Sequence, residues 1–216
     1  MFQYVLFDLD GTLTDPKTGI TSCVQYALAD AGIEEPDLDK LEPFIGPPLT
    51  DSFREFYGFD DEQIKRAIDK YHERFDEKGI FENEIIEGIP ELLKALKDAG
   101  RRVSIASSKP RPLVIRILEH FEIAQYFDTV VGSEFDGRFA TKEAVVEEAL
   151  KQLVPSVYEK EDVAMVGDRK FDIQGARAHG LTGIGVSFGY AGEHELEDAG
   201  ADYIVDTVEA VSYTHL

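Results

Sequence analysis

Short apolar runs recur along the chain, and between them apolar side chains lie three or four positions apart. The runs are typical of strands buried on both faces of a parallel sheet, and the wider spacing is typical of amphipathic helices. The predicted strands cover residues 4–9, 103–106, 129–131, 163–166, 183–186 and 203–205. Two helical stripes between them consist of Val114, Ile117, Leu118 and Phe121, and of Val146, Ala149, Leu150 and Leu153. Strands that alternate with helices predict an α/β fold with a doubly wound, Rossmann-like parallel sheet.

The alternation stops after the first predicted strand, because residues 16–84 contain helical stripes and no strong strand signal. The stripes are Ile20, Val24, Ala27, Leu28 and Ala31, and Ile64, Ala67, Ile68, Tyr71 and Phe75. This interval is too long for an ordinary crossover connection. We therefore expect an α/β core domain of residues 1–15 and 85–216, with an inserted helical cap domain of residues 16–84. The alternative, a wholly helical first half forming its own domain, would leave residues 4–9 as a strand without a sheet.

Two acidic residues end the first predicted strand, in the sequence Asp8-Leu9-Asp10-Gly11-Thr12. Residues two apart in an extended chain point to the same side. Carboxylates are unexpected on a strand buried in a parallel sheet, and open parallel sheets bind ligands beyond the carboxyl ends of their strands. A single aspartate here would be explained by a helix cap or a turn. The pair, followed by Gly11 and Thr12, favours a functional site.

A second acidic pair, Asp168 and Asp172, follows the predicted strand 163–166. The two residues are four apart, so a helix that begins here would carry both on one face. Carboxylates gathered from two strand ends repel one another unless a cation lies between them. Oxygen ligands without a His or Cys cluster indicate Mg²⁺ rather than zinc. The alternative is that Asp168 only caps a helix.

Hydroxyl and cationic groups occur in two further places. Ser107, Ser108 and Lys109 follow the predicted strand 103–106, and hydroxyls with backbone N–H groups at a helix start would form a phosphate cradle. Lys142 lies at the start of a predicted helix, where the helix dipole disfavours a cation, so an anionic partner would explain it. Helix caps of similar composition and a solvated surface lysine are the alternatives.

The composition limits the possible partners. Asp and Glu total 43 against 22 Lys and Arg, which gives a formal net charge of −21. Such a chain repels phosphate backbones and anionic lipids, so we expect neither a nucleic-acid polymer nor a membrane as partner. The single cysteine excludes an intrachain disulfide framework and a multi-cysteine zinc site. The chain shows no signal-peptide pattern and no apolar run of membrane-spanning length, so we expect a cytoplasmic protein.

The chain resembles the haloacid dehalogenase-like (HAD) superfamily. The resemblance rests on Asp8-Leu9-Asp10-Gly11-Thr12, Ser107, Lys142 and Gly167-Asp168 with Asp172, in that order. The helical insertion just after the first motif resembles the phosphoglycolate-phosphatase-like branch. However, Lys142 is not followed by the Pro-x-Pro of that branch, and the longer stretch 132–138 resembles its 5′-nucleotidase-like subgroup. Together these features imply a phosphatase that acts on a small phosphorylated metabolite.

The resemblance also implies a role for each acidic residue. Asp8 would attack phosphorus and form an aspartyl-phosphate, and Asp10 would act as general acid and base. Mg²⁺ would be held by Asp8, by the backbone carbonyl of Asp10 and by Asp168, while Asp172 would orient the metal's ligands.

The phosphate-binding residues are likewise implied by the resemblance. Ser107 and Lys142 would hold the phosphoryl oxygens, together with backbone N–H groups near Gly11, Thr12 and Ser108. Substrate choice would fall to the turn that contains Gly46, Pro47 and Pro48, and to Lys109. The alternative is that this turn is an ordinary connection between two helices.

Several alternatives stay open at this point. A sugar phosphomutase retains the same core chemistry, and only the cap would distinguish it. A non-catalytic phospho-acceptor or binding module, such as a receiver domain, would lack both the insertion and the second acid of the Asp8/Asp10 pair. Residues 211–216 show neither helical nor strand periodicity, and the chain is compatible with a monomer or a homodimer.

Overall fold

The computed structural model describes residues 2–134, 136, 138–154 and 157–213. By their contacts, these residues divide into two units. We call residues 1–14 with 85–216 the core unit and residues 15–84 the helical unit. Phe135 and Gly137, which belong to the stretch used for the subgroup resemblance, lie outside the described residues, as do residues 214–216.

The core unit contains a six-stranded sheet in the order β5-β4-β1-β6-β7-β8, and each neighbouring pair is parallel. The strands are β1 Tyr4–Phe7, β4 Arg102–Pro110, β5 Thr129–Ser133, β6 Val163–Gly167, β7 Thr182–Val186 and β8 Tyr203–Val205. The chain moves outward from β1 through β4 to β5, and then returns to β6 on the other side of β1. This arrangement confirms the predicted doubly wound α/β fold and places a topological switch point beside β1.

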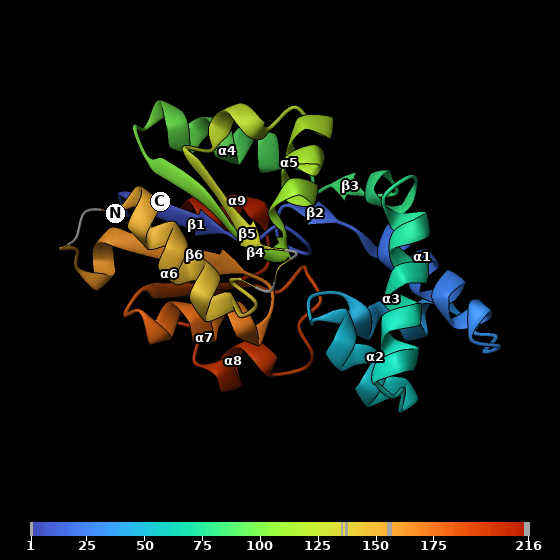
Figure 1. The fold of residues 1–216 in the computed structure, drawn as a ribbon. Helices are drawn as coiled ribbons and strands as arrows, with labels where there is room; N and C mark the ends of the chain where they lie inside the picture. Colours follow the sequence, from blue (N-terminus) through green and yellow to red (C-terminus); the bar gives the residue numbers. More distant parts are fainter. Residues whose placement is uncertain (1, 135, 137, 155–156, 214–216) are drawn as a thin grey trace. The chain divides into compact units, whose positions relative to one another are not determined.

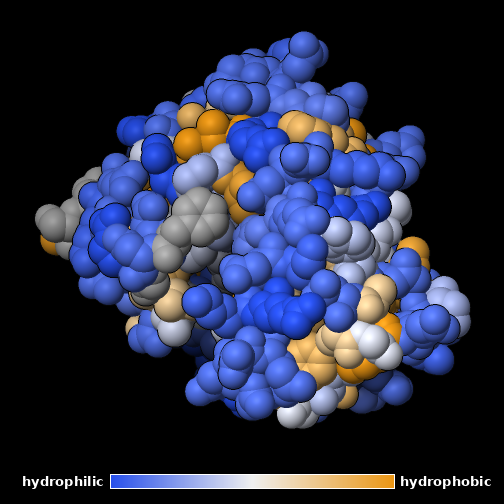
Figure 2. Space-filling view, turned by 45° about the vertical axis from the view of Figure 1, so that its right-hand side comes forward, coloured by the Kyte–Doolittle hydropathy of each residue, from blue (hydrophilic) through white to orange (hydrophobic). Residues whose placement is uncertain are grey.

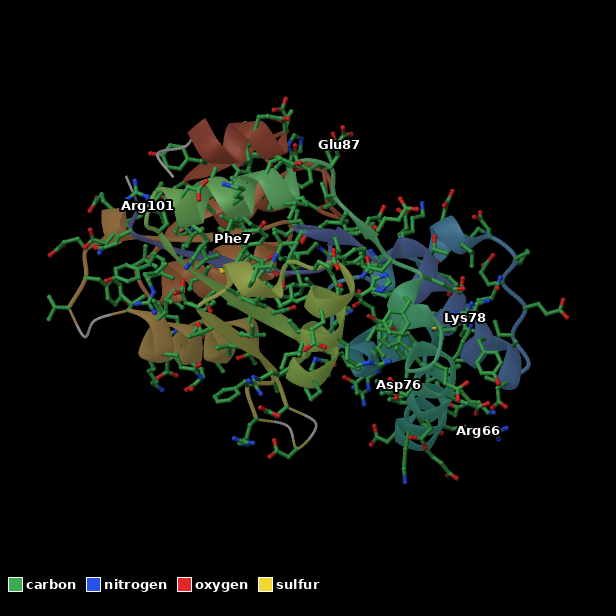
Figure 3. All side chains as sticks on the ribbon, turned by 90° about the horizontal axis from the view of Figure 1, so that it is seen from above. Phe7, Arg66, Asp76, Lys78, Glu87 and Arg101 are labelled. Atoms are coloured by element: carbon green, nitrogen blue, oxygen red, sulfur yellow. The ribbon has the colours of Figure 1, made fainter. Side chains whose placement is uncertain are left out.

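Helices cover both faces of this sheet (Figure 1). One face carries α4 Ile89–Asp98, α5 Arg111–His120 and α9 Val208–Tyr213, and the other carries α6 Lys142–Leu153, α7 Lys170–Ala178 and α8 Glu195–Ala199. The short 3₁₀ helices η3 Ala124–Tyr126 and η4 Lys160–Asp162 lie in connections. All four side chains of β1 are buried, and Leu6 packs in one cluster with Val146 and Met165. Phe7, labelled in Figure 3, ends this strand directly before Asp8.

Several predicted strands begin or end at other residues than in the structure, and two of these differences bear on the site. β1 ends at Phe7 rather than at residue 9, because the chain turns immediately after Asp8. β4 continues to Pro110 rather than ending at residue 106, since Ser107 and Pro110 pair with β5 across a shift in register. Polar residues before a proline are typical of a turn, so the sequence pattern concealed the pairing.

The last helix also corrects an expectation. Residues 211–213, for which no periodicity was predicted, belong to α9. Val208 and Val211 are buried, and Thr207 accepts a hydrogen bond from Ala210 N–H at 3.1 Å. Two apolar positions are too few to establish a helical stripe in the sequence. Packing against α4 provides the stabilisation that this short helix would not have on its own.

The helical unit has a core of its own. It contains α1 Lys17–Asp30, the 3₁₀ helix η1 Leu38–Phe44, α2 Leu49–Tyr57, α3 Asp61–Phe75 and the 3₁₀ helix η2 Gly79–Phe81. α1 packs on α3, and the rings of Phe44 and Phe53 meet edge to face at 5.0 Å. Two short strands, β2 Thr14–Asp15 and β3 Glu84–Ile85, pair where the chain leaves and re-enters the core unit.

One face of the molecule is strongly polar. The face shown in Figure 2 is largely hydrophilic, with small and separate hydrophobic areas, as expected from 43 acidic and 22 basic residues. Among the described residues, no helix has both the length and the apolar character needed to cross a bilayer.

Candidate active site

Acidic and basic side chains of the core unit converge at the carboxyl ends of the central strands. Asp8 directly follows β1, and its N–H donates to Val166 O at 2.9 Å, which extends the ladder one residue past the strand. Asp168 follows the neighbouring strand β6, and Ser107 lies on β4, on the other side of β1. The topology thus gathers residues that are far apart in the sequence.

Three buried carboxylates form the centre of this site. Asp8, Asp168 and Asp172 each contribute an oxygen, and these oxygens all lie within 4.8 Å of one another. The sequence predicted that Asp168 and Asp172 would share a helix face, but α7 begins only at Lys170, so Asp168 precedes the helix. Asp172 lies in the first turn and accepts a hydrogen bond from Arg169 N–H at 3.0 Å. The carboxylates of Asp168 and Asp172 lie close together because the loop before α7, rather than the helix itself, positions Asp168.

Lys142 joins two of these acids. Its Nζ lies 2.8 Å from Asp8 Oδ1 and 2.8 Å from Asp172 Oδ1, and it donates a hydrogen bond to Ala106 O at 3.0 Å. Lys142 is the first residue of α6, where Thr141 caps the helix. Lys142 is therefore not a solvated surface lysine, and its anionic partners in this structure are carboxylates. Binding of a phosphoryl group by Lys142 stays a prediction.

Burial controls the electrostatics of the cluster. Desolvation, reinforced by Asp172 and Asp8, raises the pKa of Asp168 well above its ordinary value. Desolvation also raises the pKa of Asp172 to about 6, although Lys142 opposes the shift. For Lys142, burial lowers the pKa but the neighbouring Asp172 and Asp8 outweigh it, so the net shift is upward and the ammonium group is retained. When all three acids are ionised, the cluster contains more negative charge than one lysine can balance.

These residues fit a hard divalent cation. Oxygen ligands of Mg²⁺ are about 3 to 4 Å apart around the ion, and the three carboxylate oxygens lie within 4.8 Å of one another. With Asp10 and Lys109, the site holds four carboxylates and two ammonium groups, an excess of two negative charges when all are ionised. A divalent ion would offset this excess, and the donor set contains no sulfur or imidazole that would favour zinc.

Asp10 is paired with a different lysine. Lys109 Nζ lies 2.6 Å from Asp10 Oδ2, and both side chains are largely buried. Burial raises the pKa of Asp10, and the Lys109 ammonium only partly counteracts this effect. Among the described residues, Asp10 Oδ1 has no hydrogen-bond partner. One oxygen is therefore held in place while the other is available to accept or donate a proton.

The turn after β1 brings Gly11 and Thr12 against Asp168. Gly11 has a φ of +78°, and a Cβ there would lie 2.2 Å from Asp168 Oδ2, so only glycine fits. Thr12 Oγ1 donates to Asp168 Oδ1 at 3.3 Å. The N–H groups of Gly11 and Thr12 donate to Thr14 O and Leu9 O within the turn. Phosphate binding by these two residues stays a prediction, and their observed contacts are with the turn and the acidic cluster.

The serine segment differs from the expected phosphate cradle. Ser107 is buried on β4 and its Oγ accepts a hydrogen bond from Lys109 N–H at 3.3 Å. Ser108 O accepts a hydrogen bond from Ser133 Oγ at 2.7 Å. The predicted helix start at this point is wrong, because α5 begins at Arg111 after the longer strand. Binding of a phosphoryl group by Ser107 and Ser108 stays a prediction that does not involve a helix N-terminus.

A loop contact at Asp168 was missed by the sequence reasoning. Tyr190 N–H donates to Asp168 Oδ2 at 2.8 Å, and a Cβ at Gly189 would lie 2.3 Å from Asp168 Cβ. The donor is a backbone N–H, so no residue type marks this hydrogen bond in the sequence. The sequence offers only a glycine-rich run after a predicted strand as a sign of a tight loop here.

The residues proposed for substrate choice lie in different units. Gly46, Pro47 and Pro48 form the turn between η1 and α2 of the helical unit, and Gly46 has a φ of +102°. Lys109 lies in the core unit against Asp10. A role of these residues in substrate choice stays a prediction.

Comparison with known proteins finds a matching family model, related sequences and similar solved structures. A family model described as haloacid dehalogenase-like hydrolase matches residues 5–186. A 5′-nucleotidase of Pseudomonas aeruginosa is 45% identical over 196 residues, which cover 90% of this chain and 87% of the relative. A crystal structure of a predicted phosphatase from Clostridium acetobutylicum has a TM-score of 0.92 and 45% identity, and the match covers 100% of both chains.

A further relative has a different activity. A tyrosine-protein kinase of Mycobacterium tuberculosis is 40% identical over 188 residues, which cover 87% of this chain but 63% of the kinase.

Proposed function

Because the chain belongs to the haloacid dehalogenase-like hydrolase family, we propose that it is a Mg²⁺-dependent phosphatase that hydrolyses small phosphomonoesters through an aspartyl-phosphate on Asp8. The observation that carries the proposal is the buried cluster of Asp8, Asp168 and Asp172, with oxygens within 4.8 Å of one another. Mg²⁺ bound to these carboxylates would supply the positive charge that lets an anionic nucleophile approach an anionic phosphoryl group.

The first half of the reaction is assigned to the two acids of the first motif. The Asp8 carboxylate attacks phosphorus, and the bond between phosphorus and the leaving oxygen breaks. Asp10 donates its proton to that oxygen. The raised pKa of Asp10 supports this role, because it increases the protonated fraction before attack.

The second half restores both residues. Asp10, now ionised, takes a proton from a water molecule, whose oxygen attacks the phosphorus of the aspartyl-phosphate. Inorganic phosphate leaves and the Asp8 carboxylate is regenerated. Lys142, 2.8 Å from Asp8 Oδ1, keeps a positive charge beside the reacting oxygens in both halves.

The choice of substrates to test is supported by the relatives rather than by the core chemistry. The 45% identity to a 5′-nucleotidase supports nucleoside monophosphates as the substrates to test first. The test measures phosphate release from nucleoside monophosphates, phosphoglycolate and hexose phosphates, with Mg²⁺ and with EDTA. A sugar phosphomutase would isomerise a hexose phosphate and release little phosphate. Mg²⁺-independent release, or no release from any ester, would contradict the proposal.

The kinase relative favours a second candidate, transfer of the phosphoryl group to a tyrosine hydroxyl instead of to water. This activity would require ATP as the phosphoryl donor. Incubation with ATP labelled at the γ-phosphate separates the two functions, because a kinase places the label on protein tyrosine, whereas a phosphomonoesterase leaves protein tyrosine unlabelled and releases phosphate from the esters.

A further inference from the structure

A partly buried ion pair lies beside the acidic cluster without being part of it. Arg169 Nε lies 2.8 Å from Glu195 Oε1, and each side chain is 14% exposed. The same Oε1 accepts a hydrogen bond from Lys170 N–H at 2.8 Å, and Oε2 accepts one from Gly192 N–H at 3.1 Å. Glu195 therefore connects the start of α7 to the loop that precedes α8.

Both connected segments hold a carboxylate of the cluster. Arg169 N–H donates to Asp172 Oδ2 at 3.0 Å, and Tyr190 N–H, two residues before Gly192, donates to Asp168 Oδ2 at 2.8 Å. Backbone groups thus orient the two acids, and the Arg169–Glu195 pair fixes the position of one segment relative to the other.

The loop is packed too closely to be rearranged without effect on Asp168. A Cβ at Gly189 would lie 2.3 Å from Asp168 Cβ and 2.4 Å from Gly11 O. A shift of this backbone would therefore displace the carboxylate or break its hydrogen bond to Tyr190. Partners that orient metal ligands typically change metal affinity by about 10-fold to 100-fold when they are removed.

We propose that Glu195 and Arg169 are positioning residues that set the divalent-metal affinity of the site by holding Asp168 and Asp172 in place. The inference rests on the proposed function, since it assumes that the acidic cluster binds a metal. Neither side chain needs to touch the metal or the substrate.

The test uses Mn²⁺ alone as the probe, and counts the free ion by its electron paramagnetic resonance signal. Glu195→Gln and Arg169→Met are each expected to raise the dissociation constant of Mn²⁺ about 10-fold. The double variant should show little further increase, because both substitutions break the same connection. Saturating Mg²⁺ should restore most of the turnover number, which a general loss of folded enzyme would not allow.

Glu193→Gln is the matched control. It removes the same charge two residues earlier, in the loop that precedes α8, but the Glu193 side chain is 91% exposed and its nearest polar partner is His194. The dissociation constant of this variant for Mn²⁺ should stay within about twofold of wild type, because solvent screens the exposed charge of Glu193.

Three outcomes would overturn the inference. Unchanged Mn²⁺ affinity in folded Glu195→Gln and Arg169→Met, with affinity lost in Asp168→Asn, would reject the positioning role and leave the proposed function intact. Failure of both single variants to fold would assign the pair to general stability. Absence of Mn²⁺ binding by the wild type would reject the inference together with the metal dependence of the proposed function.

Discussion

Lys142 Nζ lies 2.8 Å from Asp8 Oδ1, so the residue assigned as nucleophile is paired with a buried ammonium group from a different element of the fold. The same Nζ is 2.8 Å from Asp172 Oδ1. Lys142 thus offsets the charge of two acids that the sheet topology has brought together. Removing one partner of a buried ion pair leaves uncompensated charge, which destabilises a protein by about 3 to 5 kcal/mol.

We therefore predict that Lys142→Met lowers both turnover and stability. Phosphate release should fall at least about 100-fold, because the positive charge beside the reacting oxygens is lost. The melting temperature in EDTA should also fall. Lys151→Met is the control, since Lys151 lies on the same helix and forms an exposed pair with Glu147. Equal effects of the two substitutions would contradict a special role for Lys142.

The pKa values of the cluster predict how stability depends on pH. Burial raises the pKa of Asp172 to about 6 and also raises that of Asp168. Between the ordinary pKa of an aspartate and about pH 6, the folded metal-free protein therefore holds protons that the unfolded chain has already released. Its free energy of unfolding falls as the pH rises through this range. Carboxyl groups whose pKa is lowered in the folded protein, such as Asp128, are ionised near neutrality in both the folded and the unfolded chain. They therefore do not oppose this fall in stability.

The measurement compares melting temperatures near pH 5 and near pH 7, with EDTA and with Mg²⁺. In EDTA, the melting temperature should be lower near pH 7 by about 5 °C. Mg²⁺ should remove most of the difference, because it stabilises the ionised carboxylates. Asp172→Asn should reduce the pH dependence in EDTA. A melting temperature in EDTA that rises between the two pH values would contradict the assignment.

The site shows which features a sequence can predict and which it cannot. Buried parallel strands are apolar, so Asp8 and Asp168 stood out at strand ends, and the fold then required them to meet. The pairing of Ser107 with β5 and the burial of Val208 depend on tertiary packing, which local patterns do not record. The hydrogen bond from Tyr190 to Asp168 comes from the backbone, so no residue type marks it.

The proton role of Asp10 predicts a dependence on the leaving group. Asp10→Asn should slow hydrolysis of alkyl phosphates by about 100-fold to 10,000-fold, because their leaving oxygens require a proton. p-Nitrophenyl phosphate has a good leaving group, so its first step should be affected far less. The aspartyl-phosphate should then accumulate, and it is seen as a burst of nitrophenol in stopped-flow kinetics. Equal rate losses for both substrates, without a burst, would exclude the general-acid role.

Gly11 provides a test of the close approach to Asp168. A Cβ at Gly11 would lie 2.2 Å from Asp168 Oδ2, whereas a Cβ at Gly32 has nothing within 4 Å. Both residues have nearly the same φ, +78° and +80°. Gly32→Ala should therefore cost only about 1 to 2 kcal/mol of backbone strain. Gly11→Ala should carry the same strain and also lose divalent-metal binding, measured by titration calorimetry. Retained metal binding in Gly11→Ala would contradict the close contact between the turn and Asp168.

The central claim is that Asp8 carries the phosphoryl group during turnover. It is tested most directly by quenching the working enzyme in acid and locating the modification by mass spectrometry. We predict one phosphoryl group on the Asp8 side chain, formed only with Mg²⁺, and its complete absence, together with loss of phosphate release, in Asp8→Asn. Phosphate release by the Asp8→Asn variant, or a phosphoryl group on another residue of the wild-type enzyme, would contradict it.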